Sequence, residues 1–595
     1  MKAPDLKKWD FKPEMEGILF FAQLGNELLF DYTVDAYKVP ALNSRTLALE
    51  LLHSIEDYES NILKKGAIKP IIKELVDRFT KDTVIQEIIS DYFGEYIESI
   101  SKEQPILELK EKVMFLLNKL EDRYFFVTKK QLKEAILNQK EKERITRLTR
   151  NYIIELIDRG YSPQFIYFES ERFFFSGRFP QKIDDLEIID KYFDLFPLET
   201  RKFHVIYRAA KSFGLIKEYA PNLGIEIAED PPELPFRGSD KVESFLSKHE
   251  QFPLFLVVKG NESLDEINAR AMADERLFLV DSLSKYHIHR GELQRSNEAL
   301  VYSDDNKRFG VYKKPSPSVM KRPDRDSDKL PNLIKGTIAV ITSDKLQPDS
   351  FHRLIRAFWR HNTAVRSEAP ENQLLEFWSA IEVLFPPAPE ESDRILQITG
   401  SMTCFETSGY AAKIGADLYK SIKNSQVADA LRVLNEVPEG GNVIEKCLAL
   451  FSIENNEPIR IKFYKLFEKH PLLKNRIYYL STKFSSADLV LQALGGHMER
   501  VSWQIQRIYR ARNLIIHSGK TLPYVNILVE NLHSYLDRVL DLLNEKIPHS
   551  SHSTTIDQIA LEVKLECESH FHILKKLGKE ICTSDNYKLI LFGNK

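Results

Sequence analysis

The residues best suited to chemistry lie between Met498 and Lys520, in the stretch MERVSWQIQRIYRARNLIIHSGK. Arg512 is followed directly by Asn513, and His517 comes four residues later. A histidine has a reference pKa of about 6.5, so it can accept or donate a proton at neutral pH. An arginine stays positively charged and can hold an oxyanion through two parallel hydrogen bonds. These residue types favour proton transfer beside an anionic group.

A helical arrangement of this stretch gives it two different faces. At about 100° per residue, one side has the spacing of a core-facing stripe. The stripe consists of Val501, Ile505, Ile508 and Ile515, and the opposite side carries Gln506, Arg510, Asn513 and His517. Arg512 projects near the stripe, about 140° from His517, whereas Arg510 is nearly in line with His517. The pattern predicts a rigid helix with a reactive polar face, and it leaves open which arginine is functional.

The spacing between arginine and histidine is a weak signal by itself. An arginine separated from a histidine by four to six residues occurs at Arg512/His517, Arg510/His517 and Arg356/His361. About two such matches are expected by chance. Aromatic residues separate Arg356 from His361, and no polar residue follows the arginine, which disfavours that pair as a catalytic site. Around His517, by contrast, an asparagine, a glycine helix stop at Gly519 and further cations accompany the motif.

Two separated segments resemble one protein family. The segment YRARNLIIHSG resembles the signature of Apea-like HEPN domains, and LLEFWSAIEVLF, which contains Glu382, resembles the first-helix pattern of the same group. The resemblance covers roughly residues 345–546. The strands and helix expected upstream are also similar to the region that precedes such domains in long bacterial proteins. The resemblance implies an all-helical bundle in the C-terminal part of the chain.

The resemblance further implies an endoribonuclease that needs no metal ion or other cofactor. Two copies of the motif would form one composite cleft, so a homodimer is expected. His517 would act as acid or base and Arg512 would stabilise the transition state, with Asn513 assisting and with Arg510 and Tyr509 as secondary RNA contacts. The RNA could be transfer, messenger or ribosomal RNA. By family analogy the chain would be an anti-phage, toxin-like defence effector, with its N-terminal region sensing a phage-derived trigger or regulating the nuclease.

Two other interpretations remain open. A helical domain of this fold that no longer cleaves could serve as an adaptor for RNA or protein, or the Arg/His pattern could be accidental. Arg512 and Glu382 both point toward apolar faces, and a buried guanidinium needs a partner. An ion pair between Arg512 and Glu382 that ties the two helices together is therefore a structural alternative to a catalytic Arg512.

Composition limits the classes of protein. The 595 residues are 43% hydrophobic and 29% charged with a net charge of −3, which is typical of a multidomain globular protein and argues against a globally basic nucleic-acid coat. The four cysteines show no C-x-x-C spacing, so they predict free thiols and no zinc site. No signal peptide, apolar membrane segment or phosphate-binding glycine loop is present in the sequence. We expect a cytoplasmic location and no membrane partner.

The predicted fold is mainly α, with an α/β portion in the N-terminal part and an all-helical HEPN-type bundle in the C-terminal part. The expected regions are residues 1–160, mostly helical after a β-hairpin at Ile18–Val34; 161–330, mixed α/β; 345–546, the HEPN-like domain; and 550–595, a helical tail. In the mixed region, QFIYFES, ERFFFSG, RKFHVIYRAA and FPLFLVVKG predict strands, Ser263–Tyr286 predicts a helix, and Lys313–Pro331 predicts a linker. Ser350 is expected to cap the next helix, and Asn526–Lys546 and Ile556–Lys579 are expected to be helical.

Overall fold

The computed structural model divides the chain into two compact units, which are described separately. The larger unit contains Met1–Leu6, Asp10–Tyr152 and Pro317–Lys595, and the smaller contains Lys7–Trp9 and Ile153–Ser316. The structure describes residues 5–30, 40, 42–176, 182–234, 240–247, 250–287, 289, 293–305, 307–315, 330–385, 394–550 and 553–594. The mainly α class with a mixed portion is confirmed. No described helix is both long and apolar enough to span a bilayer.

The N-terminal part of the larger unit is mostly helical from Glu16 onward. Its helices are α1 (Glu16–Leu29), α2 (Ser44–Glu59), α3 (Lys69–Lys81), α4 (Thr83–Ile88), α5 (Phe93–Ser101), α6 (Ile106–Asn138) and the first part of α7 (Lys142–Asp158). The hairpin predicted at Ile18–Val34 is therefore wrong over its described part, which lies in α1. Nearly every residue of α1 from Gly17 to Leu28 is buried. Such a helix has apolar residues all round, and its short apolar runs imitate strands.

The C-terminal part of the larger unit contains thirteen further helices among the described residues. They are α12 (Leu330–Thr342), α13 (Pro348–Arg366), α14 (Pro370–Leu384), α15 (Arg394–Thr407), α16 (Tyr410–Asn424), α17 (Ala430–Asn435), α18 (Val443–Ser452), α19 (Glu457–Leu466), α20 (Pro471–Lys483), α21 (Ala487–Ser518), α22 (Val525–His549), α23 (Ile556–Leu577) and α24 (Tyr587–Phe592). The helices predicted at Asn526–Lys546 and Ile556–Lys579 are confirmed by α22 and α23. Ser350 is not the cap of α13: Gln347 holds that position, Pro348 follows it, and Ser350 Oγ accepts a hydrogen bond from the backbone N–H of Ile556.

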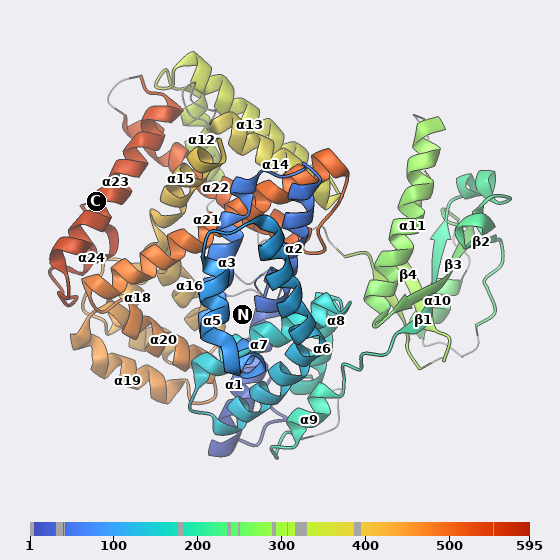
Figure 1. The fold of residues 1–595 in the computed structure, drawn as a ribbon, viewed down its shortest axis with the longest axis horizontal. Helices are drawn as coiled ribbons and strands as arrows, with labels where there is room; N and C mark the ends of the chain where they lie inside the picture. The colour runs from blue at the N-terminus through green and yellow to red at the C-terminus, as the bar shows by residue number, and fades with distance from the viewer. Residues whose placement is uncertain are drawn as a thin grey trace. The chain divides into compact units, whose positions relative to one another are not determined.

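The long helix α21 passes through two hydrophobic cores (Figure 1). Its first turns contribute to a core with α16–α20 and α24, and its second half packs with α13, α14, α15, α22 and α23. The predicted stripe is confirmed, since Val501, Ile505 and Ile508 are buried and Ile515 packs against the same core. The predicted stop is confirmed as well, because Gly519 caps α21 with a φ of 66°, a left-handed conformation that suits glycine.

A buried group of four charged side chains joins α21 to the N-terminal helices. Arg507 Nε lies 3.1 Å from both carboxylate oxygens of Glu50 on α2, and its Nη2 lies 2.5 Å from Glu74 Oε2 on α3. Arg510 Nη2 donates to Glu50 Oε1 at 2.9 Å. All four side chains are at least nine-tenths buried. Each charge is therefore kept out of water and is compensated by the others, and Glu74 Oε1 also accepts from Arg78 Nη2 on α3 at 3.3 Å.

The smaller unit is built on a five-stranded antiparallel sheet with the order β2-β3-β1-β4-β5. Its elements are α8 (Pro163–Phe174), α9 (Ile188–Phe193), β1 (Arg201–Ala209), β2 (Ile225–Ala228), α10 (Asp240–Leu246), β3 (Leu254–Ser263), α11 (Glu266–His287), β4 (Arg295–Ser303) and β5 (Phe309–Lys313). Successive side chains of β1 point to opposite faces of the sheet. Phe203, Val205 and Tyr207 pack toward α11, whereas Ile206 packs toward α10.

Half of the strand predictions in this region are confirmed. RKFHVIYRAA and FPLFLVVKG correspond to β1 and β3, and the helix predicted at Ser263–Tyr286 corresponds to α11. QFIYFES and most of ERFFFSG are not strands, because they form α8. Ser162 caps α8 by accepting a hydrogen bond from the N–H of Phe165, and Pro163 occupies the first turn. Most of the linker predicted at Lys313–Pro331 lies outside the described residues.

Arg507→Ala tests how much the buried charges contribute to the free energy of unfolding. The substitution leaves Glu50 and Glu74 buried with less compensation, so the free energy of unfolding should fall by about 3–5 kcal/mol. Lys73→Ala is the matched control, because Lys73 Nζ and Glu499 Oε1 form an exposed ion pair between the same helices, α3 and α21. That loss should be about 0–1 kcal/mol. Urea unfolding followed by circular dichroism compares the two, and equal losses would contradict the assignment.

The same group of charges predicts an acid-sensitive contribution to stability. Burial raises the pKa of Glu50, but the charges of Arg507 and Arg510 outweigh that effect and lower the pKa to about 2. In the unfolded chain a glutamate titrates near about 4.3. The contribution, on the order of 3 kcal/mol, is therefore present above about pH 4.3 and is lost as the pH falls toward about 2.

Glu50→Gln should remove this contribution. The urea midpoints of the wild type and the variant should differ most above about pH 5 and should converge near about pH 2, where the wild-type carboxyl group is also becoming neutral. A constant difference between pH 6 and pH 2 would show that Glu50 does not carry this pH dependence.

Candidate functional site

The second half of α21 places Arg512 against α14. Arg512 Nη1 donates to Asn513 Oδ1 at 3.0 Å, and Arg512 Nη2 lies 3.9 Å from Glu382 Oε1 on α14. The Arg512 side chain remains 25% exposed. The ion pair between Arg512 and Glu382 that the sequence suggested is therefore present, with a long separation between the charged atoms. Part of the guanidinium still faces solvent.

Glu382 is fixed by one neighbour on its own helix and by one on α15. Trp378 Nε1 donates to Glu382 Oε1 at 2.9 Å, and Arg394 Nη1 lies 3.8 Å from the same oxygen. The fully buried Trp378 ring also lies 5.7 Å, centroid to centroid, from the ring of Tyr509 on α21. Tyr509 therefore helps to pack α21 against α14, and its side chain is half-buried.

His517 lies in the last turn of α21 and is exposed. Its neighbour Ile516 is 48% exposed, so the end of this helix presents an apolar side chain beside the imidazole. In the described part of the chain no hydrogen bond or ion pair joins His517 to Arg512. The continuous helix accounts for this, since five residues turn the two side chains about 140° apart. One copy of the chain therefore places the two groups on different sides of α21.

The prediction that Arg510 shares an exposed face with Asn513 and His517 is wrong. Arg510 is 3% exposed, and its guanidinium is bonded to Glu50, so in this structure it is not available to RNA. Helix α21 is continuous through Arg512, so Arg510 and Arg512 point in different directions from it. Arg510 lies in the buried charge group, whereas Arg512 is partly exposed. One of the further cations near His517 is also paired, since Lys520 Nζ lies 3.6 Å from Asp57 Oδ1.

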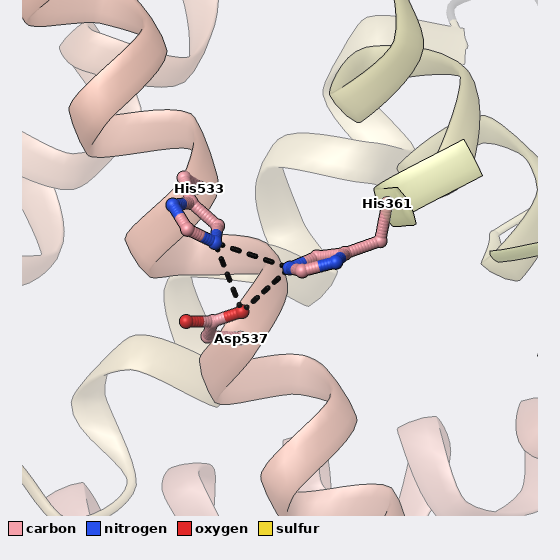
Figure 2. A group of neighbouring side chains, drawn as sticks. All are labelled: His361, His533 and Asp537. Carbon is pink, nitrogen blue, oxygen red and sulfur yellow. Dashed lines mark hydrogen bonds and ion pairs between the residues drawn. The ribbon is translucent and has the colours of Figure 1, made fainter. Parts of the chain in front are cut away.

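A second group of titratable side chains lies between α13 and α22. His361 comes from α13, and His533 and Asp537 come from α22 (Figure 2). His361 Nε2 lies 3.1 Å from His533 Nε2 and 3.2 Å from Asp537 Oδ1. His533 Nε2 lies 3.5 Å from Asp537 Oδ1. Three potential ligand atoms therefore converge on one point, although the sequence had predicted no metal site.

Phe377 of α14 positions both imidazoles. Its buried ring stacks on His533 with centroids 4.7 Å apart and an interplanar angle of 13°, and it meets the ring of His361 at 5.5 Å and 64°. His533 and Asp537 are four residues apart, so they lie on the same face of α22. This i, i+4 spacing of a histidine and an aspartate was the available sequence signal. His361 entered the sequence analysis only as a disfavoured partner of Arg356.

Comparison of the chain with protein-family models, with curated proteins and with solved structures finds no match.

Two substitutions distinguish the ion pair between Glu382 and Arg512 from the hydrogen bond that Glu382 accepts from Trp378. Glu382→Gln removes its charge but keeps an oxygen for Trp378 Nε1, so it should cost less than about 1 kcal/mol of unfolding free energy. Glu382→Ala also leaves the Trp378 N–H without its acceptor and should cost about 1–3 kcal/mol. Urea unfolding of the two variants checks the difference. Equal losses would mean that the ion pair with Arg512 dominates over the hydrogen bond from Trp378.

Proposed function

We propose that the chain is an endoribonuclease of the HEPN type that cleaves RNA without a catalytic metal ion. Arg512, Asn513 and His517 would act at the reacting phosphate. The observation that carries the proposal is the placement of the motif: an exposed imidazole at the end of a rigid, core-packed helix, with a partly exposed guanidinium five residues earlier. The two sequence segments that resemble this family also pack together, because Glu382 and Trp378 of the first contact Arg512 and Tyr509 of the second.

The residue types suit cleavage by transesterification. The ribose 2′-hydroxyl attacks the adjacent phosphorus while a base removes its proton. The bond from phosphorus to the 5′-oxygen breaks, and an acid protonates the leaving oxygen. The products are a 2′,3′-cyclic phosphate and a 5′-hydroxyl. His517 supplies proton transfer, and Arg512 stabilises the negative charge that builds on the phosphoryl oxygens. Asn513, which accepts a hydrogen bond from Arg512, orients that guanidinium.

The angle between the two side chains supports a site made from two copies. Arg512 and His517 project from different sides of α21, so one chain does not present both to a single phosphate. A symmetric pair would bring two copies of His517 to one cleft and supply both an acid and a base. The exposed Ile516 beside His517 gives that surface an apolar contact.

The N-terminal helices are the natural regulators of this site. Glu50 on α2 and Glu74 on α3 hold Arg507 and Arg510, which lie within two turns of Arg512 on the same helix. A trigger that displaced α2 or α3 would disturb α21 directly. The role as a defence effector that responds to a phage-derived trigger rests on analogy with the family.

One observation favours a second candidate function. Asn513 and Glu382 already engage the Arg512 guanidinium, which limits its freedom to bind phosphate. A chain that folds in this way but does not cleave would be an adaptor that binds RNA or protein.

Cleavage of a labelled single-stranded RNA in the presence of EDTA tests the ribonuclease proposal. The full-length chain should give 2′,3′-cyclic phosphate ends and should leave a 2′-deoxy analogue intact. His517→Ala should lower the cleavage rate by about 10²–10⁴-fold, and Arg512→Ala should lower it by about 10²–10³-fold. The same variants should abolish growth arrest in cells that express the chain, with or without phage.

His549→Ala is the matched control, because His549 is also an exposed histidine in the last turn of a long helix. It should cleave as fast as the wild type. Cleavage that requires magnesium, or that survives His517→Ala, would overturn the mechanism. A folded chain that binds RNA but neither cleaves it nor arrests growth would identify the adaptor.

A further inference from the structure

We infer that His361, His533 and Asp537 form a binding site for a divalent transition-metal ion of the zinc class, with one coordination position left for water. The site shares no residue with the motif at Arg512 and His517, and it uses none of the residues assigned to RNA cleavage. Its three ligand atoms come from two helices of one hydrophobic core, so their backbone positions are fixed by packing.

The distances fit a metal ion. Zinc bonds to imidazole nitrogen and carboxylate oxygen are about 2.0–2.2 Å long, which places neighbouring ligands of a tetrahedron about 3.3–3.6 Å apart. The three separations between Nε2 of His361, Nε2 of His533 and Oδ1 of Asp537 are 3.1, 3.2 and 3.5 Å, so one lies within this range and two are about 0.1–0.2 Å shorter. The three atoms thus form a nearly equilateral triangle, and an ion slightly above its plane would contact all of them.

The direction of the lone pairs favours the same assignment. Both histidines aim Nε2 at the centre of the group, as Figure 2 shows, and Asp537 turns one carboxylate oxygen toward it. Without an ion, the facing Nε2 atoms can bond to each other only if one is protonated and the other is not. A metal ion accepts both nitrogens and the carboxylate oxygen at once, and two neutral nitrogens with one carboxylate match the ligands of known open zinc and iron sites.

Burial and packing suit an exchangeable site with an open position. The side chains of His533, Asp537 and His361 are 10%, 22% and 26% exposed, so solvent can reach one side of the group. The ring of Phe377 covers the imidazoles from α14 and restricts their rotation. An ion held here would link α13 to α22 through ligands that the fold already positions.

Metal titration of the full-length chain tests the inference. The chain is first stripped with a chelator and then titrated with Zn²⁺ or with Co²⁺, whose visible spectrum reports tetrahedral coordination by nitrogen and oxygen. About one ion per chain should bind, and saturation should raise the unfolding temperature. His361→Gln and Asp537→Asn should each weaken binding by more than about 100-fold, because even the loss of an outer-sphere partner costs about 10–100-fold.

Two controls isolate the site. His352→Gln changes another histidine of α13, and His517→Ala changes the residue assigned to RNA cleavage; both should bind the ion as tightly as the wild type. The metal-free variants should unfold at the temperature of the metal-free wild type, which excludes misfolding as the cause of lost binding. If the wild type binds no ion, or if His361→Gln and Asp537→Asn bind as tightly as it does, the group is a hydrogen-bonded triad without a metal. Because binding is measured without RNA, that result would leave the ribonuclease proposal standing.

Discussion

The larger unit depends on a buried arrangement in which two guanidiniums and two carboxylates neutralise one another. Glu50 accepts from both Arg507 and Arg510, and Arg507 also reaches Glu74, so the four charges form one connected group. Removing any member leaves another charge buried without full compensation, which costs far more than the loss of an exposed pair. The group requires α2, α3 and α21 to meet in one relative position. It therefore sets the orientation of the helix on which the candidate catalytic motif lies.

This constraint explains why the sequence analysis wrongly predicted that Arg510 lies on an exposed face. Its acidic partner is 460 residues away along the chain, and the partner of Arg507 on α3 is 433 residues away. A helical wheel assigns charged residues to solvent unless a partner is known, so Arg510 was assigned to the exposed polar face. The pairing of Arg512 with Glu382 could be foreseen, because both residues broke an apolar face and each needed compensation. The group of His361, His533 and Asp537 was missed for the same reason as the partner of Arg510, because only folding brings α13 beside α22.

The fold was predictable where the amphipathic period was clear. The stripe of α21, the glycine at its end and the strands β1 and β3 all follow from local pattern. The errors at α1 and α8 arise where residues are apolar or aromatic on several sides, because burial by other elements then decides the structure. At α8 the decisive signals were the serine and proline at its start, Ser162 and Pro163, which were outweighed by the β propensity of the residues that follow.

Helix α14 connects the two candidate sites. Glu382 holds Arg512 from one side of the helix, and Phe377, five residues earlier, packs on His361 and His533 from another. Trp378 lies between them in sequence, is fully buried and contacts both Glu382 and Tyr509. A shift of α14 would therefore alter the support of the Arg512 guanidinium and of the two imidazoles together. Close packing favours discrete rearrangements over gradual deformation. An ion held between α13 and α22 would restrain the contacts of Phe377, and through α14 that restraint would extend to Glu382 and Arg512.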